Sequence, residues 1–169
     1  VYKRQVDDAP RPHEAAAVIE RINALTERAR AAGVPVAFVQ HENEVDLVFD
    51  SERWQLAGAL HTDTRDARLR KTTPDSFLRT PLDAWLSERG VKRVVVCGYS
   101  SEFCVDTTVR RAAGLGYEVT LAADAHTSHD KPHATGARIR AHHNVTLADI
   151  TSFGVPIRAV DSAQVSFGG

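Results

Sequence analysis

The chain has 169 residues, 43% hydrophobic and 25% charged, which excludes an intrinsically disordered protein and suits one globular domain. Its formal net charge of −1 creates no overall field that would attract nucleic acid or acidic lipid. No apolar run approaches the roughly 20 residues that cross a bilayer, and two cysteines exclude a disulfide-rich scaffold. We therefore expect a single domain over residues 1–169 in a reducing cytoplasm, with neither nucleic acid nor a membrane as partner.

The first five residues are unusual. Val1 to Gln5 can be encoded by GTG TAT AAG AGA CAG, which matches the end of a transposon adapter used to prepare sequencing libraries, and the chain contains no methionine. We expect residues 1–5 to be adapter-derived, as in a metagenomic fragment, and the natural protein to begin upstream of Val6. The alternative is an ordinary polar N-terminus, which an uninterrupted gene encoding these residues would establish.

The first half of the chain predicts one long helix and two strands. Apolar residues recur at three- and four-residue steps over residues 13–32, which predicts an amphipathic helix. Residues 34–39 are β-branched and mostly apolar, as in a buried strand, and residues 69–71 predict a second, short strand. The polar stretch over residues 40–68 is long for a connection, which indicates a functional loop, and we expect Trp54 to anchor it.

Strands and helices continue to alternate in the second half. We predict strands over residues 91–97, 119–123 and 155–160, and helices over residues 81–89, 104–113 and 133–143. Apolar strands joined by helices imply a mainly parallel sheet covered on both faces, a three-layer α/β/α arrangement of Rossmann-like type. Ligands bind beyond the carboxyl ends of such strands, where Lys71, residues 98–100 and Asp124 fall.

Cys104 has the sequence context of a nucleophile. A strand ends at Gly98, and a short polar turn leads into a helix whose start carries the cysteine. The N–H groups and partial positive charge of a helix N-terminus favour a thiolate and can hold the oxyanion formed when a carbonyl is attacked. Lys71, at another strand's end, adds positive charge. The alternative is that Cys104 is a small buried hydrophobic residue.

The segment around this cysteine resembles a known family. Residues 94–112, VVVCGYSSEFCVDTTVRRA, resemble the nucleophile segment of isochorismatase-like cysteine hydrolases, with the strand, glycine, polar loop, Cys-Val, Thr and Ala in the same order. Residues 71–77 are similar to the family's lysine segment and residues 33–36 to its second strand, while residues 116–125 continue the match. The resemblance covers nearly the whole chain and implies the isochorismatase-like fold.

The resemblance also assigns site residues. It implies Cys104 as the nucleophile, Lys71 beside it, and a cis peptide between Tyr99 and Ser100. That turn would aim the N–H groups of Ser100 and Cys104 at one oxyanion. We expect the substrate pocket to be lined by His41, Trp54 and Phe77, although packing in the core or a loop explains these three residues equally well.

The activity implied is hydrolysis of an amide-type bond in a small molecule. The Cys104 thiolate attacks the carbonyl, the amine leaves, and water cleaves the thioester. True isochorismatases cleave a vinyl ether without a thiol, so Cys104 favours the amide branch. The resemblance further implies a homo-oligomer, and no cofactor is expected. The alternative is a catalytically silent or truncated relative that only binds small molecules or its own copies.

One part of the family's pattern is missing from the sequence. The family's catalytic Asp ends a first apolar strand, and that position would fall just before Val1. Asp7 and Asp8 are the nearest carboxylates, but no apolar strand precedes them, so we interpret them as exposed loop residues. We therefore expect the N-terminal strand and its Asp to lie upstream of this chain.

Two alternative chemistries, a serine nucleophile and a metal site, have only weak support in the sequence. Residues 98–102 resemble a serine nucleophile elbow, but Glu102 replaces its closing glycine. Residues 40–43 lack the Asp-x-His metal segment of nicotinamidase-type relatives. Five histidines cluster in the second half of the chain, which suggests metal, but we expect them on loops and helix surfaces and predict no metal site. They are His126, His129, His133, His142 and His143.

Overall fold

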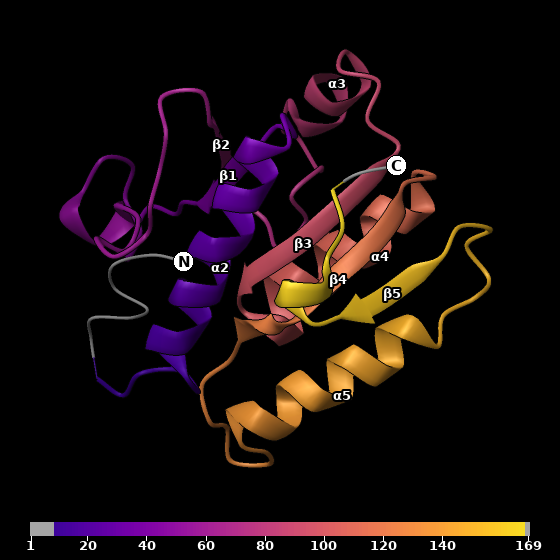
Figure 1. Cartoon of the computed structure of the whole chain (residues 1–169). Helices are drawn as coiled ribbons and strands as arrows, with labels where there is room; N and C mark the ends of the chain where they lie inside the picture. The colour runs from indigo at the N-terminus through magenta and orange to yellow at the C-terminus, as the bar shows by residue number, and fades with distance from the viewer. Residues whose placement is uncertain (1–8, 168–169) are drawn as a thin grey trace.

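The computed structural model describes residues 9–167. Its helices, labelled as in Figure 1, are α2 (Ala15–Ala31), α3 (Leu82–Ser87), α4 (Asp106–Gly114) and α5 (Gly136–Ala148). Its strands are β1 (Ala37–His41), β2 (Ala67–Lys71), β3 (Arg93–Tyr99), β4 (Glu118–Thr127) and β5 (Ile157–Val160). Each predicted element is present with shifted ends. The largest differences are that β4 continues through Thr127 and α5 through Ala148, so that Asp124 lies inside a strand and not at its end.

All strand pairs are parallel, and they form two sheets. β1 pairs with β2, and β3, β4 and β5 pair in that order. Figure 1 shows α2 in front of the strands and α4 behind them. The protein is therefore a three-layer α/β/α structure, as its alternating elements predict.

Strand β3 supplies both faces of the core. Val94 and Val96 pack into one hydrophobic cluster with α3 and α4, whereas Val95 and Cys97 pack into a second cluster with α2. Successive side chains of a strand point to opposite faces, and both faces here are covered by helices. This explains why residues 94–97 of β3 form an unbroken apolar run.

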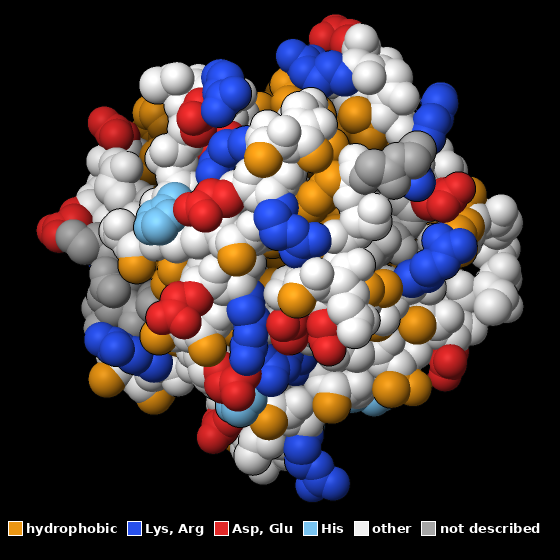
Figure 2. Space-filling view, viewed as in Figure 1, with side chains coloured by type: hydrophobic (Ala, Val, Ile, Leu, Met, Phe, Trp, Pro, Cys, Tyr) orange, Lys and Arg blue, Asp and Glu red, His pale blue; other side chains and the backbone are white. Residues whose placement is uncertain are grey.

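A cavity separates the two sheets. Among residues 9–167, β1 has only β2 as a strand neighbour and β3 has only β4. Between β1 and β3 lies a cavity of ≈ 440 Å³. Apolar residues of both strands and of the helices on both faces line it, among them Ala37, Val39, Val94, Val96, Leu25 and Leu86. Figure 2 shows apolar side chains in a hollow on this side of the molecule, beside α2. We call this space the inter-sheet slot.

The start of α5 is packed against the end of β4 without room for a side chain. A Cβ added to Gly136 would meet the backbone carbonyl oxygen of Ser128 and lie 2.9 Å from Cβ of His13. The Ser128 carbonyl cannot easily move, because it accepts a 3.0 Å hydrogen bond from the backbone N–H of His13. The glycine thus lets α5, β4 and the entry to α2 meet at one point.

We predict that Gly136→Ala destabilises the protein by about 1–3 kcal/mol, the usual cost of overpacking against backbone. Thermal unfolding of the variant and the parent measures the difference. Gly58→Ala is the matched control, because nothing lies within 4 Å of its added Cβ. Equal losses in both variants would contradict this account of the α5 contact.

Candidate active site

Cys104 lies in the turn between β3 and α4. Residues Ser101–Val105 form one π-helical turn, so α4 begins at Asp106 and not at Cys104 as the sequence predicted. The carbonyl of Ser100 accepts hydrogen bonds from the N–H groups of Phe103 at 3.2 Å and Val105 at 3.1 Å. Cys104 itself is half-buried and lines the inter-sheet slot.

The backbone before this turn is also unusual. Gly98 has a φ of 124°, a conformation that L side chains rarely adopt, and the peptide bond between Tyr99 and Ser100 is cis. This is the position at which the family resemblance placed a cis bond. Ser100 is 2% exposed, so the turn is held within the protein and not on its surface.

Lys71 lies beside Cys104. It ends β2, and its side chain is only 4% exposed. Its ammonium donates a 2.7 Å hydrogen bond to the carbonyl of Pro74. Burial lowers the pKa of Lys71, whereas the Cys104 sulfur, which shares a hydrogen bond with it, opposes that shift. The structure thus brings the predicted pair together at one end of the slot.

Buried hydroxyls tie the lysine loop to the nucleophile's helix. Thr108, one turn beyond Cys104, donates from Oγ1 to the Ser76 hydroxyl at 2.8 Å and accepts from the Ser76 N–H at 3.2 Å. Its Oγ1 also lies 3.4 Å from the carbonyl of Pro74, the same carbonyl that Lys71 contacts. These contacts fix the loop after β2 against α4 and so set where Lys71 meets Cys104.

The second cysteine has a different environment. Cys97 lies within β3, and burial raises the pKa of its thiol to about 11. A thiol with so high a pKa is protonated at neutral pH and is a poor nucleophile. Of the two free cysteines, Cys104 alone has an ammonium as its neighbour among the described residues.

The three predicted pocket residues fall in different places. Phe77 is 7% exposed, lines the slot and stacks on Tyr117 at 5.9 Å. His41 ends β1, with Nδ1 3.4 Å from the Thr73 carbonyl. Burial lowers the pKa of His41, and the nearby charge of Lys71 lowers it further. His41 therefore lies near the site without lining the slot.

Trp54 does not line the slot. It packs in a small separate cluster with Leu47, and its ring meets that of Phe49 edge-on at 5.1 Å. Its backbone carbonyl accepts a 3.1 Å hydrogen bond from the buried side chain of Gln40. Because its ring is buried within the loop's own cluster, Trp54 anchors that loop, as the sequence predicts, and its place in a substrate pocket stays a prediction.

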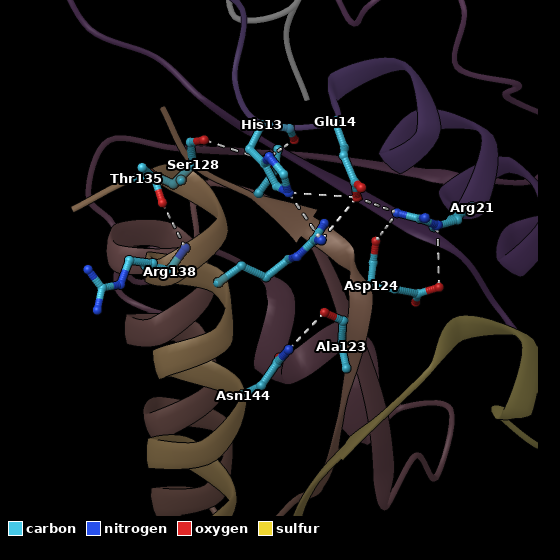
Figure 3. Close-up of polar contacts among 12 residues, drawn as sticks. His13, Glu14, Arg21, Ala123, Asp124, Ser128, Thr135, Arg138 and Asn144 are labelled. Carbon is cyan, nitrogen blue, oxygen red and sulfur yellow. Dashed lines mark hydrogen bonds and ion pairs between the residues drawn. The ribbon is translucent and has the colours of Figure 1, made fainter. Parts of the chain in front are cut away.

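Asp7 and Asp8, the carboxylates nearest to the missing Asp in the sequence, lie outside the described residues. Two carboxylates within the described residues have contacts of their own. Asp124 accepts hydrogen bonds from the N–H and hydroxyl of Ser162 at 2.7 and 3.1 Å and pairs with Arg21 at 3.4 Å (Figure 3). These contacts make Asp124 a tether between β4, the C-terminal segment and α2. Asp75 is close enough to act electrostatically on Lys71, but its carboxylate accepts the Phe77 N–H at 2.7 Å.

A second polar cluster joins α2 to α5. Glu14 has a φ of 51° and receives hydrogen bonds from Arg21 and Arg140, each at 3.0 Å (Figure 3). These bonds lower the pKa of Glu14. Arg21 also donates to the carbonyl of Asp124 at 3.1 Å. The cluster holds the entry of α2 against β4 and α5.

The expectation that the histidines lie on loops and helix surfaces was wrong for His126. This residue lies within β4 and is fully buried. Its two ring nitrogens contact Ser101 and Asn144, each at 2.8 Å. His129 contacts the Tyr99 hydroxyl at 2.7 Å. The described residues contain no group of three or more His, Cys, Asp or Glu side chains arranged to hold a metal.

A sequence signal for the buried histidine existed. Residues 122–128 read Ala-Ala-Asp-Ala-His-Thr-Ser, and such small side chains are compatible with a strand packed on both faces. The sequence prediction ends this strand at residue 123, with the charged Asp124 next to it. The carboxylate of Asp124 is instead paired with Arg21 and accepts a hydrogen bond from Ser162, so the strand continues.

Comparison with known proteins places this site in a family. The sequence profile of the isochorismatase domain matches residues 4–152. A streptothricin hydrolase of Streptomyces noursei is 39% identical over 123 residues, which are 72% of this chain and 45% of that protein. A secreted isochorismatase effector of Verticillium dahliae is 33% identical over 144 residues, 83% of this chain and 74% of that protein. The chain thus spans about half the length of the streptothricin hydrolases that it matches.

Solved structures agree. An isochorismatase family protein matches with a TM-score of 0.86 and 32% identity, covering 95% of this chain and 93% of the other. An isochorismatase from Pseudomonas putida matches with a TM-score of 0.87 and 25% identity, covering 98% and 86%. The profile match and these relatives show that the chain belongs to the isochorismatase family of hydrolases.

Proposed function

We propose that this site is that of a cysteine hydrolase that cleaves an amide-type C–N bond of a small molecule through a thioester. The observation that carries the proposal is the contact between the buried ammonium of Lys71 and Cys104 at the end of the slot. An ammonium beside a thiol favours the thiolate, which is the nucleophilic form. We assign the backbone N–H groups that an oxyanion needs to the turn before α4, as the family resemblance implies.

The reaction takes two steps. The Cys104 thiolate adds to the substrate carbonyl, the C–S bond forms, and the oxyanion is held by the N–H groups of Ser100 and Cys104. Collapse breaks the C–N bond, and the amine leaves with a proton from an acid of the site. Water then adds to the thioester and returns a proton to the group that protonated the amine, and the C–S bond breaks to release the carboxylic acid and the thiolate. Lys71 stabilises the anion at each stage.

Relatives support the amide branch. A streptothricin hydrolase and, at 30% identity over 139 residues, a ureidoacrylate amidohydrolase of Methylorubrum extorquens are among the proteins that this chain resembles. The second name specifies amide hydrolysis. We take small amides as the substrate class for this chain on that basis. The homo-oligomer and the cytoplasmic location stay predictions; among the described residues, no helix is long and apolar enough to cross a membrane.

We predict that Cys104→Ala abolishes hydrolysis of small amides, whereas Cys97→Ala keeps most of it, because the thiol of Cys97 is buried and its pKa is raised to about 11. Intact mass after brief iodoacetamide treatment at pH 7 should show one label, lost in Cys104→Ala and kept in Cys97→Ala. Turnover in Cys104→Ala equal to that of the parent would refute the mechanism.

Lys71 should set the alkaline limit of activity. Burial lowers its pKa, so Lys71 loses its proton below the pH at which an ordinary lysine does, near 10.4. As the pH rises through this lowered pKa, the thiolate loses its cation and turnover should fall. Arginine stays charged throughout. We therefore expect Lys71→Arg to retain charge without this alkaline limb, and Lys71→Met to lose turnover at every pH. An unchanged alkaline limb in Lys71→Arg would exclude Lys71 as its source.

The inter-sheet slot supports a second part of the proposal. The slot lies between two parallel strand edges, and its end meets Lys71 and Cys104. We propose that it accepts one further parallel strand, the first strand that the family resemblance implies. A strand parallel to β1 and β3 would place its carboxyl end, and an Asp there, beside the pair.

We predict that a version extended upstream by a short apolar strand ending in Asp is more stable and much more active than the 169-residue chain. Filling the slot would pair both strand edges and remove a cavity whose residual volume costs stability. Thermal midpoints and turnover on a panel of small amides compare the two. The control replaces the final Asp by Asn, which should keep the gain in stability and lose the gain in turnover. Equal stability and turnover in both lengths would show that residues 1–8 already supply what the strand would.

A further inference from the structure

A buried hydrogen-bond chain lies behind the nucleophile's turn. Ser101 and His126 are both fully buried, and Ser101 Oγ lies 2.8 Å from Nδ1 of His126. Nε2 of His126 lies 2.8 Å from Oδ1 of Asn144. Nδ2 of Asn144 donates to the carbonyl of Ala123 at 2.9 Å. This series of hydrogen bonds therefore runs from the turn to His126 in β4, then to Asn144 in α5 and back to the backbone of β4.

The direction of each hydrogen bond follows from the last acceptor. The Ala123 carbonyl can only accept, so the amide of Asn144 must face it with Nδ2 and present Oδ1 to His126. Oδ1 can only accept, so Nε2 of His126 carries the proton. A neutral imidazole then has a lone pair at Nδ1, and the Ser101 hydroxyl must donate to it. One tautomer of His126 satisfies every member of the chain.

The surroundings of His126 keep the ring neutral. Burial lowers its pKa to about 4, and the charges of Arg140 and His143 from α5 act in the same direction. The hydrogen bond with Asn144 and the charge of Asp124 raise the pKa of His126. Asp124, however, is engaged by Arg21 and Ser162. At neutral pH the ring is therefore an acceptor toward Ser101.

These hydrogen bonds resemble those of a Ser-His-Asn catalytic triad, but the residues lie outside the inter-sheet slot, where a substrate would bind. Neither Ser101 nor His126 lines the inter-sheet slot, whereas Cys104 and Lys71 do. The pairing between β3 and β4 shifts register beyond Val96, and the shift sets His126 opposite Gly98. His126 is thus aimed at the base of the turn and away from the space where a substrate would meet Cys104.

We propose that His126 is a positioning residue for Cys104, which holds the turn by accepting the hydrogen bond of Ser101 as a neutral, Nε2-protonated imidazole. The inference rests on the proposed function, because the turn matters only if Cys104 reacts. Ser101 follows Ser100, whose N–H is one of the two oxyanion donors, and precedes Cys104 by three residues in the same π-helical turn. Releasing Ser101 would let both the sulfur and the donors move.

The tautomer is tested first, on the unmodified protein. Nitrogen-15 NMR of the histidine rings, assigned by loss of one signal in His126→Asn, should show Nε2 protonated and Nδ1 bare from pH 8 down to pH 5. This readout needs no substrate. An Nδ1-protonated ring, or an imidazolium at pH 7, would overturn the inference whatever the turnover. Absence of any amide hydrolysis with the expected tautomer would instead count against the proposed function.

Two substitutions then separate the acceptor from the bulk of the ring. His126→Asn can place its amide oxygen near the position of Nδ1 and still accept from Ser101. His126→Gln reaches the position of Nε2 and keeps only the contact with Asn144. We expect alkylation of Cys104 by iodoacetamide at pH 7 to stay within about threefold of the parent in His126→Asn and to fall about tenfold or more in His126→Gln, since misplacement by 1 Å can cost about 100-fold. Equal effects in both variants would reduce His126 to a packing role.

A third substitution, at Asn144, keeps the shape of that side chain and changes the protonation of His126. Asn144→Asp places a carboxylate beside Nε2, which favours the imidazolium and raises the pKa of His126. Both ring nitrogens then donate, and Ser101 loses its acceptor. Alkylation of Cys104 should acquire an acid limb that begins at least about one pH unit above that of the parent, matched by the histidine's NMR titration. A raised His126 titration with no change in alkylation would show that the ring does not position the thiol. Circular dichroism at each pH confirms that the variants compared are folded.

Discussion

The contact between Lys71 and Cys104 is the one on which the rest of the site depends. A buried ammonium costs several kcal/mol unless nearby groups compensate its charge. The Pro74 carbonyl and the Cys104 sulfur both contact Lys71, and the charge of Asp75 acts on it as well. Lys71 belongs to the sheet of β1 and β2, whereas Cys104 follows β3 in the other sheet. The contact therefore joins the two sheets at their carboxyl ends, beside a slot that otherwise separates them.

Each partner in this contact is held by its own set of interactions. Lys71 is placed by the pairing of β2 with β1, where it lies opposite His41. Thr108 and Ser76 hold the loop that carries Pro74. Cys104 is placed by a turn whose Ser100 carbonyl and Ser101 hydroxyl are both engaged in hydrogen bonds. A substitution in any one set moves one member of the pair relative to the other without touching either side chain.

Residue patterns predicted the layers of this fold and the pair at its site. The valines of β3 and the apolar stripe of α2 indicate buried elements directly, because their periods match a strand and a helix. The position of Cys104 after a glycine turn then predicts a reactive thiol. Local patterns did not predict which tertiary contacts would override them. The π-helical turn depends on the acceptors that Ser100 and His126 offer, and the extension of β4 depends on Arg21, which is far away in sequence.

The same limit explains Trp54. A tryptophan in a long polar loop near a site is as consistent with a pocket as with an anchor, and only the packing of Leu47 and Phe49 on its ring shows that it anchors the loop. The inter-sheet slot has no local signal in the sequence. Its position between β1 and β3 followed only from the pairing of the strands.

The division into two sheets has a consequence for how the protein opens. β4 pairs on both sides, with β3 and with β5, whereas β1 and β2 are five-residue strands that pair only with each other among the described residues. Cooperative units of a fold open with free energies set by the contacts that they lose. The amide protons of β1 and β2 therefore exchange with solvent through a partial opening that leaves β3, β4 and β5 intact. That opening separates Lys71 from Cys104, so the lysine gains access to water while the turn and its thiol remain folded.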